Sequence, residues 1–188
     1  GSEFRVNTYT NSDQNNPSIT GLEDGGYVVT WQSSAQDGHS NGIYGQRYDK
    51  DSNAAGGEFQ INTETSYEQT TPDVTALLDG GFVVTWQSNY QDPGDSSQYG
   101  IYGQRYDASG NPFGNEFQVN TQTYQEQQDP SVTALNDGGF MVAWEGNYQD
   151  SGGSDYGIFS QRFSIDGSTD PFFTSVEALN NTGTGLDD

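Results

Sequence analysis

The sequence predicts an all-β protein of three tandem four-stranded antiparallel repeats in a propeller-like arrangement, with a β-sandwich as the alternative fold. Three observations support this prediction. Trp31, Trp86 and Trp144 are separated by 55 and 58 residues. The octapeptide GIYGQRYD occurs twice and returns once more as GIFSQRFS. The segments around these markers are rich in Val, Ile, Thr and aromatic residues, which favour strands over helices.

Each repeat contains four expected strands in the same order. The first is EFRVNT, EFQINT or EFQVNT, and a polar loop separates it from a short apolar second strand, SITGL, DVTAL or SVTAL. An Asp-Gly turn then supplies the positive φ angles of a tight hairpin and leads into a third strand in which apolar side chains alternate. The fourth strand is the octapeptide segment, at residues 42–49, 100–107 and 157–164.

The length of 188 residues fits one domain with a single sizeable core. One repeat cannot bury its own aromatic face, so the repeats are expected to cover one another. We expect one ligand-binding domain over residues 1–170, with repeats at about 3–57, 58–115 and 116–170, and a C-terminal extension over 171–188.

The charge of the chain limits its partners. Asp and Glu number 27 against 5 Lys and Arg, which gives a formal net charge of -22. Such a surface repels phosphate backbones and anionic lipids, so neither nucleic acid nor membrane insertion is expected. The chain has no cysteine, which excludes disulfides and thiolate metal sites. We expect a monomer, with self-association through the acidic C-terminal tail as an alternative.

Calcium is the expected cofactor, because a chain this acidic needs counter-cations and Ca²⁺ takes oxygen ligands from Asp- and Asn-rich loops. In an antiparallel meander the first and second loops of each repeat lie at the same end. Alternatively, the Asp, Gly and Ser residues of these loops only favour turns and solubility. The candidate metal ligands at this end are Asp13, Asp37, Glu68, Asp92, Asp95, Glu126, Asp150 and Asp155.

A second candidate lies at the opposite end. Asp49, Asp51 and Asn53 reproduce the first three ligand positions of an EF-hand loop. The match then fails, because Ala54 replaces the turn glycine and Gln60 replaces the bidentate glutamate. An Asx-type hairpin turn is the favoured interpretation.

Signs of catalysis are weak. His39 is the sole histidine and lies in a glycine-rich loop, which favours a solvent-exposed residue over a general base. A pair of carboxylates could hydrolyse glycosides, but the abundance of acids is not evidence for such a pair. The sequence therefore predicts no enzyme and no catalytic residue.

Departures between the repeats point to a ligand site. From the tryptophan to the glycine of the octapeptide segment, the second loop spans 11, 14 and 13 residues in turn. Repeats two and three also add tyrosines where repeat one has Ala35 and Asn41. Tyrosines beside calcium-binding acids could form a pocket. Arg47, Arg105 and Arg162 of the octapeptide segments are expected either to stabilise the scaffold, which is the favoured interpretation, or to bind an anionic ligand. The candidate ligand-binding residues are Tyr90, Asp92, Tyr99, Arg105, Tyr148, Asp150, Tyr156 and Arg162.

Four motifs together, EFQVNT, DGGFVVTWQS, QD before a glycine-rich gap and GIYGQRYD, resemble the calcium-dependent peptide-binding domain of giant RTX adhesins of Gram-negative bacteria. The resemblance covers residues 3 to about 164. It implies a secreted, cell-surface module of a larger adhesin that needs Ca²⁺ and functions in adhesion and biofilms. Its partners would be the C-terminal peptides of proteins on a host or neighbouring cell. A calcium-dependent, lectin-like module that binds glycans is the alternative.

Overall fold

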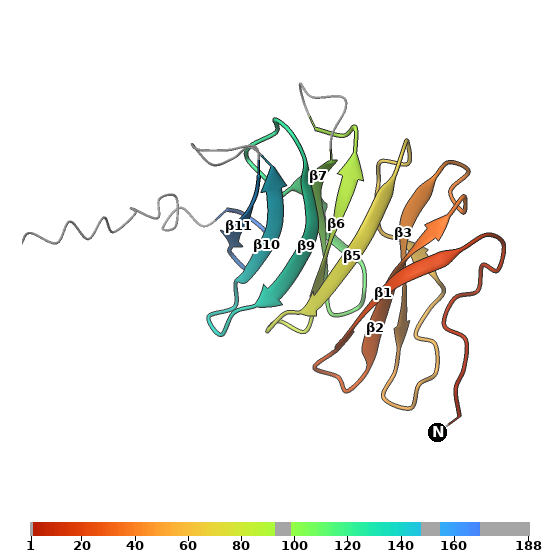
Figure 1. The fold of residues 1–188 in the computed structure, drawn as a ribbon. Helices are drawn as coiled ribbons and strands as arrows, with labels where there is room; N and C mark the ends of the chain where they lie inside the picture. The colour runs from red at the N-terminus through yellow and green to blue at the C-terminus, as the bar shows by residue number, and fades with distance from the viewer. Residues whose placement is uncertain (1, 93–98, 148–154, 170–188) are drawn as a thin grey trace, which may run out of the picture.

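The computed structural model describes residues 2–92, 99–147 and 155–169, and it confirms an all-β, propeller-like fold of antiparallel sheets placed side by side in chain order (Figure 1). No helix within these ranges is long and apolar enough to cross a membrane. The domain boundaries expected from the sequence stay a prediction. The strands are β1 (Gln14–Gly21), β2 (Tyr27–Ser34), β3 (Asn41–Tyr48), β4 (Phe59–Gln60), β5 (Gln69–Ala76), β6 (Phe82–Asn89), β7 (Tyr99–Tyr106), β8 (Pro112–Gln118), β9 (Gln127–Ala134), β10 (Phe140–Asn147) and β11 (Tyr156–Phe163).

Within the described ranges the first sheet has the order β1-β2-β3-β4, the second β5-β6-β7-β8 and the third β9-β10-β11. Every pair of neighbouring strands is antiparallel. The Asp-Gly turns join the first two strands of each sheet, and Gly25, Gly80 and Gly138 have the positive φ angles that such turns require, at 84°, 82° and 95°.

The sheets are offset from the sequence repeats. β4 and β8 belong to the EFQINT and EFQVNT segments, but they pair with β3 and β7 of the preceding repeat. The turn after β3 or β7 returns the chain along the free edge of that strand. Glycine permits the close approach: a Cβ on Gly103 would lie 2.8 Å from the ring of Phe117. The octapeptide glycine therefore leaves room for the phenylalanine of the next repeat.

The core lies between the sheets. One cluster joins the face of the first sheet that carries Ile43 to the face of the second that carries Trp86. A second cluster joins Ile101 to Trp144 in the same way. Ile43, Trp86 and Ile101 are fully buried, so each repeat buries the aromatic face of the next one.

The inner strands β1, β5 and β9 are neighbours across the sheets. Each contains a bulge at which the register with the next strand shifts. The bulge residues Asn16, Thr71 and Asp129 have φ angles of 50°, 50° and 52°, and each precedes a proline. Because left-handed φ angles are rare for side chains such as Thr71, the bulge is a constrained feature repeated in every sheet.

Candidate functional site

A cavity of about 460 Å³ lies along the inner strands and is lined by residues 16–18, 71–73 and 129–131. We call it the axial pocket. Its three walls are the equivalent tripeptides Asn-Pro-Ser, Thr-Pro-Asp and Asp-Pro-Ser of β1, β5 and β9. The central proline is shared, while the residues on either side of it differ. The scaffold therefore repeats around this pocket, but the polar groups in it do not.

Backbone geometry places these polar groups. The bulge N–H of Thr71 donates to Gln32 Oε1 of the first sheet at 3.2 Å. The bulge N–H of Asp129 donates to Gln87 Oε1 of the second sheet at 2.9 Å. Each bulge is thus tied to the preceding sheet, which fixes the position of the tripeptide that follows.

Asp73 connects all three sheets. Its Oδ1 accepts a hydrogen bond from the Ser18 hydroxyl at 2.8 Å, and its Oδ2 accepts one from the N–H of Val132 at 2.8 Å and one from the Ser131 hydroxyl at 3.3 Å. The carboxylate is half-buried. Donors on both neighbouring inner strands therefore hold it in one orientation.

Asp129 is the second carboxylate of the axial pocket, and it differs from Asp73 in being exposed. Its backbone N–H donates to Gln87 Oε1, and the residue lines the pocket. None of the residues that line the pocket is basic. The pocket thus combines one carboxylate fixed by the scaffold with one that is accessible, among small polar groups.

The residues that the sequence predicts as ligand-binding or metal-binding, where the structure describes them, lie outside the axial pocket. Asp92 is buried, and its carboxylate accepts hydrogen bonds from the Tyr102 hydroxyl at 2.8 Å and from Asn120 Nδ2 at 3.0 Å. Burial, followed by the charge of Asp92 and its hydrogen bond, raises the pKa of Tyr102. These contacts fix the start of the second loop to the β7 and β8 segments.

The two glutamates of the first loops accept hydrogen bonds from predicted ligand tyrosines. Glu68 accepts from the Tyr99 hydroxyl at 2.9 Å, and Glu126 accepts from the Tyr156 hydroxyl at 2.6 Å. Tyr90 instead packs on the ring of Tyr67, with the ring centroids 4.6 Å apart.

Arg105 and Arg162 lie at the turn end of their sheets, opposite the loops that carry the predicted tyrosines. Arg105 is buried, pairs with Asp79 and lies 4.2 Å from the ring centroid of Phe113. Arg162 pairs with Asp137 in the equivalent way. These contacts fit the scaffold interpretation, and the structure does not bring the arginines together with the tyrosines and acids of the loop end.

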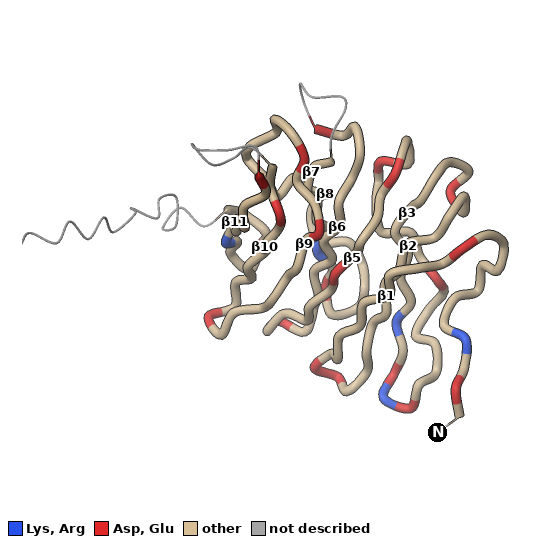
Figure 2. The backbone as a smooth tube through the Cα atoms, viewed as in Figure 1, with Lys and Arg blue, Asp and Glu red and all other residues tan. Residues whose placement is uncertain are grey.

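Acidic residues occur at both ends of the sheets (Figure 2). In the part of the chain that the structure describes, no three His, Asp or Glu side chains form a group that could hold a metal ion. Asp13 and Asp155 are exposed, while Asp37 accepts a hydrogen bond from the N–H of His39 at 3.0 Å. The predicted residues that lie outside the described ranges are Asp95, Tyr148 and Asp150.

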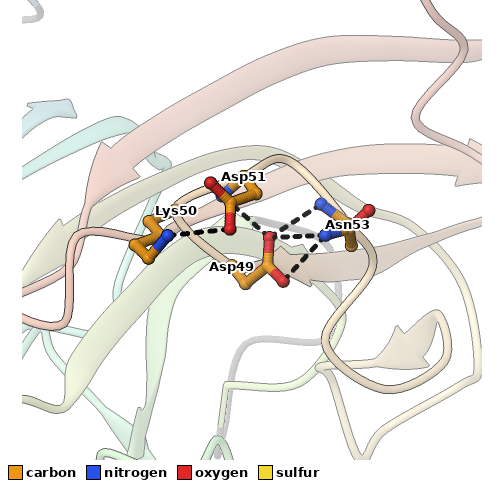
Figure 3. A network of polar contacts seen from close by, with 4 residues as sticks. All are labelled: Asp49, Lys50, Asp51 and Asn53. Atoms are coloured by element: carbon orange, nitrogen blue, oxygen red, sulfur yellow. Dashed lines mark hydrogen bonds and ion pairs between the residues drawn. The ribbon is translucent and has the colours of Figure 1, made fainter.

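The EF-hand-like segment forms the expected Asx-type turn. Asp49 Oδ1 accepts hydrogen bonds from the N–H groups of Asp51 at 2.9 Å and Asn53 at 2.8 Å, and Asn53 Nδ2 adds bonds to the same carboxylate (Figure 3). The bonds from Asn53 lower the pKa of Asp49. This carboxylate therefore closes a turn between β3 and β4.

No protein-family model and no curated protein matches the chain. Solved structures do. An endo-arabinase from Bacteroides thetaiotaomicron shares 17% identity at a TM-score of 0.52, over 86% of this chain and 60% of that one. An α-L-arabinofuranosidase from Lactobacillus brevis shares 12% identity at 0.54, over 88% and 57%. An exo-1,5-α-L-arabinanase from a bovine ruminal metagenomic library shares 17% at 0.50, over 87% and 58%. This chain spans less than two thirds of each neighbour.

The class that emerges is a propeller-like fold shared with glycoside-cleaving enzymes. The expectation of an RTX adhesin peptide-binding domain is therefore wrong, and so are the expected capture of protein C-termini, the adhesion and biofilm role and the absence of enzymatic activity. The physical reason is that the motifs behind the resemblance are scaffold. EFQVNT contributes an outer strand, and the second GIYGQRYD forms most of β7, which pairs with β6 on one side and β8 on the other and buries Ile101.

Asp73 and Asp129 are not among the residues predicted from the sequence. A signal was present, because the tripeptide around the repeated proline reads NPS, TPD and DPS, and so varies at two positions beside an invariant one. The second loops are longer and vary more between repeats, so the ligand site was predicted at the ends of the sheets instead.

Proposed function

We propose that this chain is a carbohydrate-processing module that receives a sugar unit of a glycan in the axial pocket and hydrolyses its glycosidic bond. The observation that carries the proposal is the pair of differently held carboxylates, Asp73 and Asp129, on the inner strands of a fold that known arabinan-cleaving enzymes share. A pocket of about 460 Å³ lies within the usual range for small-molecule sites.

Glycoside hydrolysis commonly uses two carboxyl groups in different states. One protonates the leaving oxygen, and the other activates water or stabilises the positive charge that develops on the sugar ring. Asp129 is exposed and therefore accessible to a bound glycan, which suits the acid–base role. Asp73 is oriented by donors on two strands, which suits the role of a fixed negative group that faces the developing charge.

Small hydroxyl groups complete the pocket. Ser18 and Ser131 donate to Asp73, and Asn16 Nδ2 donates to Gln32 Oε1 at 3.0 Å. Sugar hydroxyls both donate and accept hydrogen bonds, so a pocket of carboxylates, amides and hydroxyls can hold a sugar.

The test is the release of reducing sugar from arabinan, xylan and aryl α-L-arabinofuranosides by the purified chain. Asp129→Asn keeps the size of the side chain and removes its acid–base capacity, so we expect a loss of about 10² to 10⁴ in rate with an unchanged melting temperature. Asp51 is an exposed acid in the turn between β3 and β4. Asp51→Asn is therefore the matched control and should retain full activity. Absence of turnover by the wild type on all three substrate types would contradict the proposal.

Two further expectations stay proposals. The composition, with 25 glycines and 12 tyrosines beside 27 acidic residues, supports a secreted or cell-surface location, where glycans are met. The net charge of -22 supports stabilisation by Ca²⁺. No geometry of the described residues assigns a calcium site.

A further inference from the structure

The sheets of this chain meet through two kinds of face. We call the face that carries Trp31, Trp86 or Trp144 the leading face, and the opposite one the trailing face. The trailing face of the first sheet packs on the leading face of the second, and the trailing face of the second packs on the leading face of the third. Among the described residues, no further sheet packs on the leading face of the first sheet or on the trailing face of the third. Within those residues, Val6 of the N-terminal segment packs against the cluster of Val29, Trp31, Tyr44 and Tyr48 on the leading face of the first sheet.

Both of these end faces expose a side chain that its counterparts bury. On the trailing face, Ile43 and Ile101 are 0% exposed, but Ile158 at the equivalent position of β11 is 75% exposed. On the leading face, Val74 and Val132 are 5% and 7% exposed, but Ile19 at the equivalent position of β1 is 64% exposed. The two end faces therefore carry the two halves of an interface that the chain already makes twice.

The strands show a matching gap. EFQINT supplies the outer strand of the first sheet and EFQVNT that of the second, yet EFRVNT at residues 3–8 belongs to no strand. Phe4 of this segment is 51% exposed, whereas its counterparts Phe59 and Phe117 are partly buried against the core. In the third sheet, the pairing beyond β11 within the described residues is an isolated bridge between Phe163 and Thr169.

We propose that two copies of this chain close into one ring of six sheets, in which the trailing face of each third sheet packs on the leading face of the partner's first sheet. Residues 3–8 of each copy then add to β11 of the other as its outer strand. Six sheets lie within the four to eight that typical propellers contain. A head-to-tail contact of this kind either closes into a ring or grows into a filament, and two identical contacts between two copies close it.

The register of the added strand follows from the other two sheets. Phe59 and Phe117 lie opposite Gly45 and Gly103, so Phe4 lies opposite Ser160 of the other copy. Ser160 has a Cβ where the other sheets have glycine, and the ring of Phe4 shifts outward by a few tenths of an ångström to accommodate it. The second sheet also predicts one bridging bond: Gln87 accepts from the bulge N–H of Asp129, and Glu145 at the same position accepts from the bulge N–H of Asn16 in the other copy.

The first test is the molar mass in solution, from light scattering of the eluting protein at several concentrations. The wild type should elute at twice 20.5 kDa. Ile158→Glu and Ile19→Glu should each raise the dimer dissociation constant by at least about 100-fold, because two buried isoleucines per ring are lost. Both side chains are exposed in the single chain, so neither variant should disturb its folding. Leu78→Glu, in an Asp-Gly turn and 60% exposed, is the matched control and should remain dimeric.

The second test exploits the absence of cysteine. The double variant Phe4→Cys with Ser160→Cys should form a disulfide-linked dimer on mild oxidation, since directly opposed strand residues lie within disulfide reach. The pair Leu78→Cys with Ser160→Cys should not. A monomer at all concentrations would overturn the proposal. Masses that keep growing with concentration would also overturn it in favour of an open filament.

Discussion

At the scale of single residues, some of the acids that the sequence predicts as ligands accept hydrogen bonds that hold the loops in place. Asp92 is the clearest case, because it is buried and receives hydrogen bonds from Tyr102 and Asn120. Its counterpart in the first repeat, Asp37, is half-buried and accepts from the N–H of His39 and from Gln60 Nε2, the latter at 3.5 Å. We therefore expect equivalent acids of different repeats to contribute differently to the free energy of unfolding.

Asp92→Ala should destabilise the fold, since it removes the acceptor of the buried Tyr102 hydroxyl and one of the three acceptors of Asn120 Nδ2. An unsatisfied buried donor costs about 1 to 3 kcal/mol, so the free energy of unfolding should fall by about that amount. Asp37→Ala should cost less than half as much. Urea unfolding followed by tryptophan fluorescence measures both, and equal losses in the two variants would show that the hydrogen bonds to Asp92 are not what matters.

The buried tyrosines predict alkaline unfolding. Burial first, and then neighbouring acids, raise the pKa of Tyr44 and Tyr99 from 10.0 to about 12. Between pH 10 and 12 the unfolded chain has lost these protons and the folded chain has kept them. Stability is therefore complete below pH 10 and falls as the pH rises towards 12.

Urea unfolding at pH 8, 10 and 11 should show this loss, and Tyr99→Phe should make it smaller. Phenolate absorbance of the folded protein should rise only above pH 10 for these groups. A free energy of unfolding that is constant from pH 8 to pH 11 would contradict the raised pKa values.

At the scale of elements, the glycines of the octapeptide decide where the outer strands lie. Gly103 packs under the ring of Phe117, whereas a Cβ on Gly57 would meet open space. Gly103→Val should therefore displace β8 and lower the free energy of unfolding by about 1 to 3 kcal/mol, as overpacking usually does. Gly57→Val is the control and should change it by less than about 0.5 kcal/mol. Equal effects on the two urea midpoints would argue against the strand placement.

The strands and hairpin turns were predicted well from the sequence, but the pairing of strands between repeats was predicted less well. Alternation in GFVVTWQS and the Asp-Gly turns identified strands and hairpins, because both signals are local. The assignment of EFQINT to the preceding sheet was not visible in any local pattern, since it depends on which edge of β3 is free after the turn. The axial pocket was missed for the same reason, because Asp73 and Asp129 line one pocket only when the inner strands of different repeats are brought together.

At the scale of the whole molecule, the net charge of -22 opposes folding through self-repulsion. We expect Ca²⁺ to stabilise the folded chain by about 2.7 kcal/mol per site when it is present at about 100 times its dissociation constant. Thermal unfolding in calcium should be compared with unfolding in excess chelator. Mg²⁺ at the same concentration is the control, because general screening acts equally with either ion. Identical melting curves in all three conditions would contradict specific calcium binding.

The central claim is that the glycan enters along the inner strands and not at the loop or turn end. Amide chemical shifts of the labelled protein, titrated with an arabinose trisaccharide, test it most directly. We expect the largest shifts at residues 16–18, 71–73 and 129–131, and smaller shifts at these residues in Asp129→Asn. Shifts confined to the second loops near Tyr90 and Tyr99, with the inner strands unchanged, would contradict it.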